Sequence, residues 1–117
     1  MAAGVAELTT RLRVPVDVDV TSERFPAAVE ATAYFIIAEA LTNVTKHSGA
    51  QSAQVCVKVV DSPLTLEVQD DGIGGARPDG SGLRGLADRV VAFGGELHVE
   101  SPSHQGTRVT ARLPLSD

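Results

Sequence analysis

Three polar residues, Glu39, Asn43 and Lys46, follow one another at intervals of four and three positions. On an α-helix, which turns by about 100° per residue, this spacing places them within about 60° of one another. They lie at the edge of the apolar stripe that such a helix presents to a core. A carboxylate, an amide oxygen and an ammonium in this arrangement could bind a metal ion, a water molecule and a phosphate. The alternative is the ordinary polar shoulder of an amphipathic helix.

A second polar group, Asp70 and Asp71, opens the stretch DDGIGG, which directly follows an alternating apolar run. This position predicts an aspartate at the end of a strand, where the glycines let the backbone approach a ligand. An aspartate there can accept a hydrogen bond from an amino group. A tight turn built on Asp-Gly explains the same residues without a ligand.

The stretch GSGLRG, residues 80–85, leads into a helical pattern. Free backbone N–H groups at the positive end of a helix dipole would bind a phosphate, whereas helix capping by Ser81 is the alternative. Gly80, Gly82 and Gly85 also spell the G-x-G-x-x-G of dinucleotide-binding proteins, but about ten residues separate them from the preceding strand, which disfavours that function. A calcium loop opening at Asp70 would need glutamate where Ser81 stands.

These residues need a scaffold, and the hydrophobic pattern predicts one. Alternation predicts strands at residues 14–20, 53–61, 64–70, 96–101 and 107–115, and helical spacing predicts helices at 27–47 and 82–93. The second and third strands read as a hairpin, and the last two are joined by a turn. We therefore expect an α/β (α+β) fold: a two-layer sandwich with a mixed, mostly antiparallel sheet and helices on one face.

The composition limits the possible functions. The chain has 117 residues, 43% of them hydrophobic, which is enough for one compact domain. Fifteen acidic against ten basic residues argue against binding to nucleic acid or directly to a membrane. The single cysteine, Cys56, excludes disulfide frameworks and is expected to be a buried structural thiol.

No apolar stretch is long enough to span a membrane, and no signal-peptide pattern occurs, so we expect a cytoplasmic chain, with any membrane anchor elsewhere in the parent protein. Residues 1–13 are expected to be a linker or the end of a preceding helix, and residues 14–117 the functional domain.

Four motifs occur in order: EALTNVTKH, DDGIGG, GSGLRGL and GTRVTARLPL. With them, the chain from about Val14 to Leu115 resembles the ATP-binding catalytic domain of bacterial sensor histidine kinases, which have the Bergerat ATP-binding fold of the GHKL superfamily. GSGLRGLADRV and the short lid at residues 76–79 are most similar to the branch that partners NarL-type response regulators. The resemblance implies that the domain binds ATP and Mg²⁺ and donates the γ-phosphate to a histidine.

The resemblance also implies roles for residues that match the family's motifs. Asn43 would hold Mg²⁺, and Glu39 would be the catalytic residue that orients or activates the nucleophile. Asp70 would bind the adenine amino group with support from Thr107, while Asp71 fills a variable position. The remaining implied nucleotide contacts are Lys46 and His47 near the phosphates, and Gly72, Gly74, Gly80, Ser81, Gly82, Leu83 and Gly85 in the two glycine-rich motifs.

The acceptor histidine of such a kinase lies on a helical dimerisation domain, in a motif that none of His47, His98 and His104 matches. The chain is therefore expected to be the catalytic half only and to phosphorylate a histidine supplied by that separate domain. Two other functions stay open: an anti-sigma-factor serine kinase of the same fold, and a non-catalytic interaction module.

Overall fold

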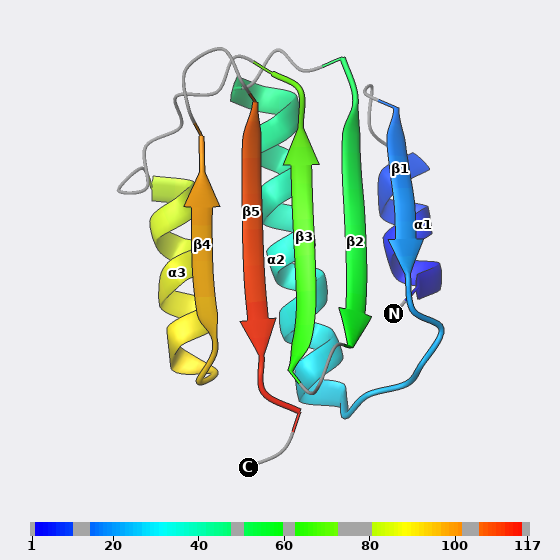
Figure 1. The fold of residues 1–117 in the computed structure, drawn as a ribbon, viewed down its shortest axis with the longest axis vertical. Helices are drawn as coiled ribbons and strands as arrows, with labels where there is room; N and C mark the ends of the chain where they lie inside the picture. Colours follow the sequence, from blue (N-terminus) through cyan, green and yellow to red (C-terminus); the bar gives the residue numbers. More distant parts are fainter. Residues whose placement is uncertain are drawn as a thin grey trace.

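The computed structural model describes residues 2–10, 15–47, 51–59, 63–72, 81–101 and 106–115 of the chain. Figure 1 shows how the helices and strands are arranged. In chain order these elements are α1 (Ala2–Thr10), β1 (Val16–Val20), α2 (Ala27–His47), β2 (Ala53–Val59), β3 (Leu64–Asp70), α3 (Ser81–Ala92), β4 (Glu96–Glu100) and β5 (Thr107–Leu113).

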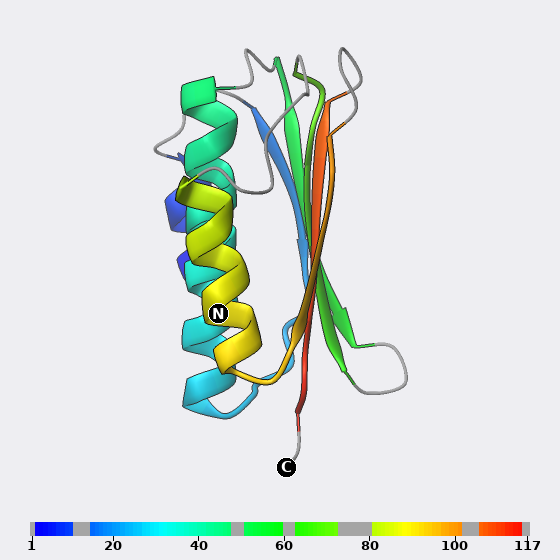
Figure 2. The same ribbon diagram turned by 90° about the vertical axis from the view of Figure 1, so that its left-hand side faces the viewer.

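The five strands form one sheet in the order β1-β2-β3-β5-β4. β1 runs parallel to β2, and the other three neighbouring pairs are antiparallel. All three helices cover the same face of the sheet (Figure 2). The predicted two-layer fold with a mixed, mostly antiparallel sheet is therefore confirmed, as is the hairpin of β2 and β3.

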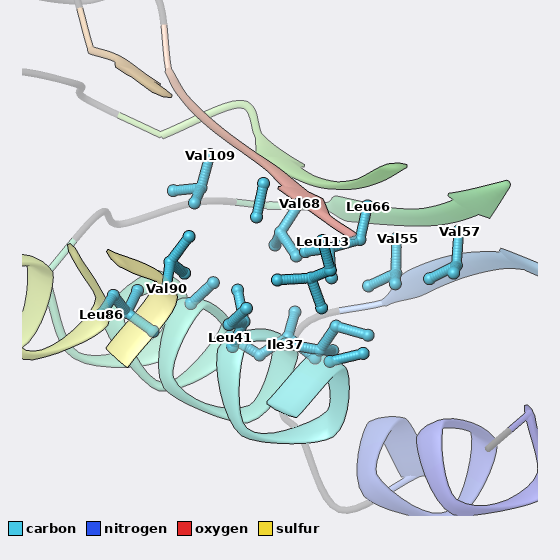
Figure 3. Close-up of a cluster of buried hydrophobic side chains, with 14 of the residues drawn as sticks. Ile37, Leu41, Val55, Val57, Leu66, Val68, Leu86, Val90, Val109 and Leu113 are labelled. Carbon is cyan, nitrogen blue, oxygen red and sulfur yellow. The ribbon is translucent and has the colours of Figure 1, made fainter. Parts of the chain in front are cut away.

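The core lies between the sheet and the helices (Figure 3). Every second residue of β2 and β3 is buried except Val59 at the end of β2, which is half-buried, because alternate side chains of a strand point to opposite faces. Full burial of an aliphatic side chain contributes roughly 1.5–3 kcal/mol. The strands supply Val55, Val57, Leu66, Val68, Val109 and Leu113, and the helices supply Ile37, Leu41, Leu86 and Val90.

No described helix covers the opposite face of the sheet (Figure 2), to which β3 directs Thr65, Glu67 and Gln69. Cys56 lies between the buried residues Val55 and Val57, so its side chain points to this open face and is only half-buried. The prediction of a buried thiol is wrong, because the valine-rich sequence around Cys56 marks a strand but the alternation decides the face. Along the edge strand β1, Val18 is likewise 38% exposed despite its apolar character.

Local contacts explain where the helices begin and end. Ahead of α2, the Glu30 carboxylate accepts hydrogen bonds from the backbone N–H of Phe25 at 3.0 Å and from Arg24 Nε at 3.2 Å, and the bond from Phe25 lowers the pKa of Glu30. Beyond α3, Gly94 has a φ of 92° and its N–H donates to the carbonyl of Val91 at 2.9 Å. This left-handed residue ends the helix.

Residues 2–10 form α1, whose Val5 is fully buried against the rest of the domain. The assignment of residues 1–13 to a linker or to the end of a preceding helix remains a prediction. None of the described helices combines the length and the apolar character needed to cross a membrane.

Candidate functional site

The candidate site lies at the end of the sheet where β3 ends and β5 begins (Figure 1). In the sheet register, Asp70 at the end of β3 is opposite Thr107 on one side and Ala53 on the other. The C-terminal end of α2 reaches the same edge (Figures 1 and 2). The tertiary structure thus brings the strand-end aspartate and the polar end of the long helix to one place.

Asp70 is the only charged side chain that is buried in the described part of the chain, with 7% of its surface exposed. Its Oδ1 accepts a hydrogen bond from the backbone N–H of Gly72 at 2.7 Å. Burial raises the pKa of Asp70 above its ordinary value, and the backbone N–H groups of Gly72 and Thr107 only partly offset this effect. The site therefore contains a carboxylate that is desolvated and held in place by backbone amides.

Gly106 allows the chain to pass close to the backbone of Asp70. Its φ is +78°, and a Cβ atom built on it would collide with the carbonyl oxygen of Asp70. The next residue, Thr107, directs its backbone N–H to the Asp70 side chain, and its Oγ1 lies 2.7 Å from Oγ of Ser101. A residue with a side chain at position 106 would push β5 away from Asp70.

Glu39 and Asn43 are both half-buried on α2, next to the buried residues Ala40 and Leu41. This burial agrees with their predicted position at the edge of the apolar stripe. Both present oxygen atoms, the ligands that Mg²⁺ prefers, and Mg²⁺ usually takes only one or two protein ligands with the rest from phosphates and water. Among the described residues no group of three or more His, Cys, Asp or Glu side chains could hold a metal ion. The oxygen donors on α2 are of the type that would bind Mg²⁺ together with phosphate oxygens.

The other predicted contact residues are placed only in part. Gly74 and Gly80 lie outside the described residues, as do the side chains of Lys46, His47 and Ser81, although these three residues belong to α2 and α3. Gly82 lies in the first turn of α3. Leu83 is 6% exposed and belongs to the core, whereas Gly85 is exposed, with no described atom within 4 Å of a Cβ built on it.

Four residues of this edge were not among the predicted contacts: Gly106, Ser101, Asp71 and Ser52. Asp71 is exposed, yet its carboxylate accepts hydrogen bonds from Ser52 and Gln51, which lower its pKa. The predicted hairpin contained the signal for this contact, because pairing Asp70 with Ala53 puts residues 71 and 52 opposite each other. Gly106 could have been found from the Gly-Thr pair that opens the last predicted strand.

Comparison with known proteins gives the relatives of the chain. Residues 28–117 match the family described as histidine kinase-, DNA gyrase B- and HSP90-like ATPases. The oxygen sensor histidine kinase NreB of Staphylococcus carnosus is 29% identical over 102 residues, which cover 83% of this chain and 29% of that protein. The sensor histidine kinase NarS of Mycobacterium tuberculosis is 34% identical over 123 residues, which cover 98% and 28%. The chain thus spans less than a third of the length of these relatives.

Solved structures agree with the fold. The blue-light activated histidine kinase EL346 of Erythrobacter litoralis has a TM-score of 0.81 at 25% identity, over 98% of this chain and 39% of that chain. The ATP-binding domain of PrrB from Mycobacterium tuberculosis has a TM-score of 0.75 at 19% identity, over 99% and 91%. At 19% identity the second likeness concerns the fold alone.

Replacing Asp70 with asparagine tests the cost of the buried charge. Because the pKa of Asp70 is raised above 3.8 in the folded protein, ionisation favours the unfolded chain, whose pKa is unshifted. We expect the free energy of unfolding of the wild type, relative to Asp70→Asn, to be greatest below pH 3.8 and to fall as the pH rises through the raised pKa. Urea unfolding of both proteins across this range measures the difference. If the difference in unfolding free energy between the two proteins did not change with pH, the conclusion that burial raises the pKa of Asp70 would be contradicted.

Proposed function

The chain belongs to the family of histidine kinase-, DNA gyrase B- and HSP90-like ATPases, and on this premise we propose that it binds Mg-ATP at the edge formed by α2, β3 and β5 and donates the γ-phosphate to a histidine. It is a histidine-kinase-type ATP-binding domain, homologous to sensor histidine kinases. The observation that carries the proposal is the buried, amide-held carboxylate of Asp70. It lies at the end of the domain that the C-terminal end of α2 also reaches, and the C-terminal half of that helix carries Glu39 and Asn43. These relatives favour a histidine kinase over an anti-sigma-factor serine kinase or a non-catalytic interaction module.

Asp70 recognises adenine in this proposal. A carboxylate has two oxygens and about four acceptor positions, so the bonds from Gly72 and Thr107 leave capacity for the adenine amino group. Guanine has a carbonyl oxygen at the corresponding ring position, and two acceptors would face each other there. The carboxylate therefore selects adenine over guanine, and its orientation depends on backbone N–H groups that cannot rotate away.

The phosphates lie toward the C-terminal end of α2. Asn43 is the proposed Mg²⁺ ligand, and Lys46, His47 and the glycines of the second motif are the proposed phosphate contacts. When bound, Mg²⁺ would neutralise negative charge on the phosphates. Without it, the carboxylates of Asp70 and Glu39 would repel the nucleotide. This repulsion makes the metal a requirement for tight binding.

The transfer step needs an acceptor domain in addition to this chain, which spans less than a third of the length of its sensor-kinase relatives. A nitrogen of the acceptor imidazole attacks the γ-phosphorus, the bond to ADP breaks, and a P–N bond forms while ADP leaves. Glu39 is the proposed residue that orients the imidazole and accepts its proton. The acceptor belongs to a histidine-bearing dimerisation domain, and we propose a NarL-type response regulator as the next phosphate acceptor in the cytoplasm.

Adenine selection can be measured with Asp70→Asn. The amide has one oxygen and an NH₂ group where the carboxylate has two oxygens, so a donor would face either the backbone amides or the adenine amino group. We expect ATP binding to weaken by about 1–3 kcal/mol, and the preference for ATP over GTP to shrink. Calorimetric titration of the folded variant with each nucleotide checks this, and unchanged ATP affinity would contradict the role of Asp70.

Metal dependence can be measured with Asn43→Ala. Removing Mg²⁺ with EDTA should sharply weaken ATP binding by the wild type, because the acidic side chains are then unscreened. In Asn43→Ala, which lacks the proposed ligand, the affinities with and without Mg²⁺ should become similar. Equal ATP affinity of the wild type in the presence and absence of EDTA would count against the metal.

Phosphotransfer requires an acceptor added in trans. We expect the chain to transfer label from γ-labelled ATP to the dimerisation domain of a related sensor histidine kinase, and Glu39→Gln to slow the transfer by about a hundredfold. Acid-labile label on that domain, followed over time, measures the rate. A domain whose acceptor histidine is replaced serves as the control. Labelling that does not depend on that histidine would contradict the proposal.

A further inference from the structure

Asp71 connects two segments of the candidate site that are far apart in the sequence. Its Oδ1 accepts hydrogen bonds from the backbone N–H groups of Gln51 at 2.8 Å and Ser52 at 3.0 Å. Its Oδ2 lies 2.9 Å from the hydroxyl of Ser52, which donates to it. The backbone N–H of Asp71 donates in return to the carbonyl of Ser52 at 3.3 Å. One residue thus makes four hydrogen bonds to two consecutive residues.

The hydrogen bonds to the Asp71 side chain are strong although the residue is exposed, because their acceptor is an ionised carboxylate. Bonds to an ionised carboxylate are roughly twice as strong as bonds between neutral groups. The hydrogen bonds from Ser52 and Gln51 lower the pKa of Asp71, so the carboxylate is ionised at neutral pH. Its charge is directed at backbone donors of the neighbouring segment, and neither Gln51 nor Ser52 carries a charge. The contact is therefore an anchor for the backbone and not a surface ion pair.

The anchored segment directly follows the helix that carries the proposed metal ligand. α2 ends at His47, and only residues 48–50 separate it from Gln51. A connection of this length spans at most about 14 Å. The bonds of Asp71 to Gln51 and Ser52 therefore limit how far the last turn of α2 can move relative to the sheet. This turn ends at His47, four residues after Asn43.

In the sequence, Asp71 lies between the two residues that form the proposed adenine contact. Asp70 precedes it, and Gly72, which donates its N–H to Asp70, follows it. We infer that Asp71 is a positioning residue, which holds the metal-binding end of α2 at a set distance from the adenine-binding carboxylate. This inference rests on the proposed function, and it gives the variable position within the stretch DDGIGG a defined task in this chain.

The test compares Asp71→Ala with Asp71→Asn. Alanine removes all three side-chain bonds, whereas asparagine keeps an oxygen for the two backbone N–H groups and can bond to the Ser52 hydroxyl through its amide. We expect Asp71→Ala to bind Mg-ATP roughly tenfold more weakly, a loss typical of residues that orient metal ligands, and Asp71→Asn to bind like the wild type. Calorimetry with and without EDTA measures both affinities, and the loss should be confined to the Mg-dependent part.

Two comparisons separate positioning from charge. Removing a negative charge by itself would strengthen the binding of anionic ATP in both variants, which is opposite to the loss expected for Asp71→Ala. Asp19→Ala is the matched control, since Asp19 has an exposed carboxylate on β1 that is paired with Lys58 at 3.5 Å, and it lies opposite Cys56, whereas Asp70 lies opposite Ala53. We expect this control to keep the wild-type dependence on Mg²⁺.

Hydrogen exchange follows the anchor directly. The amide protons of Gln51 and Ser52 should exchange faster in Asp71→Ala than in the wild type and stay protected in Asp71→Asn. Wild-type Mg-ATP affinity in a folded Asp71→Ala overturns the inference alone, while a wild type that binds no Mg-ATP overturns the proposed function and the inference with it. If Asp71→Ala does not fold, Ser52→Ala replaces it. A smaller loss of Mg-dependent affinity is then expected, and an unchanged affinity overturns the inference.

Discussion

Burial of the Asp70 carboxylate is the constraint on which the rest of the site depends. A charged group with 7% exposure is costly unless donors surround it, and the donors here are the backbone N–H groups of Gly72 and Thr107. For Thr107 to reach Asp70, β5 must begin directly beside the end of β3, and Gly106 must pass against the Asp70 carbonyl without a side chain. The sheet register and one positive φ thus follow from a single desolvated carboxylate.

The second layer supplies the other half of the site. α2 packs onto the sheet through residues such as Ile37 and Leu41, which turns the half-buried side chains of Glu39 and Asn43 toward the border between the layers. The hydrophobic core stops at this border, so polar groups there are neither fully buried nor fully hydrated. Asp71 joins the two halves by hydrogen bonds to the segment after α2. The proposed adenine and metal sites therefore depend on the same packing of helix against sheet.

Much of the fold could be predicted from the pattern of apolar residues. α2 has the predicted bounds, Ala27–His47, because its apolar spacing is uninterrupted and a glycine follows, and β3 has the bounds that its alternation predicts. The error concerns exposure. Cys56 is predicted to be buried, but alternation assigns it to the face that no described helix covers. Val18 is partly exposed despite its apolar character because β1 is an edge strand. Sequence marks which residues alternate, but the position of a strand in the sheet decides how deeply they are buried.

The sequence by itself determined the chemical groups and their order: the carboxylate and amide one helical turn apart, the strand-end aspartates, and the glycines, which together carry the resemblance to sensor histidine kinases. Only the tertiary structure decided what these groups contact. It placed β5 next to β3, so that Thr107 meets Asp70, and it set residue 52 opposite Asp71. The physical reason is that periodicity and propensity act over neighbouring residues, whereas these hydrogen bonds join residues nearly 20 to nearly 40 positions apart. Such contacts exist only once the strand order, the register and the packing of α2 have been established together.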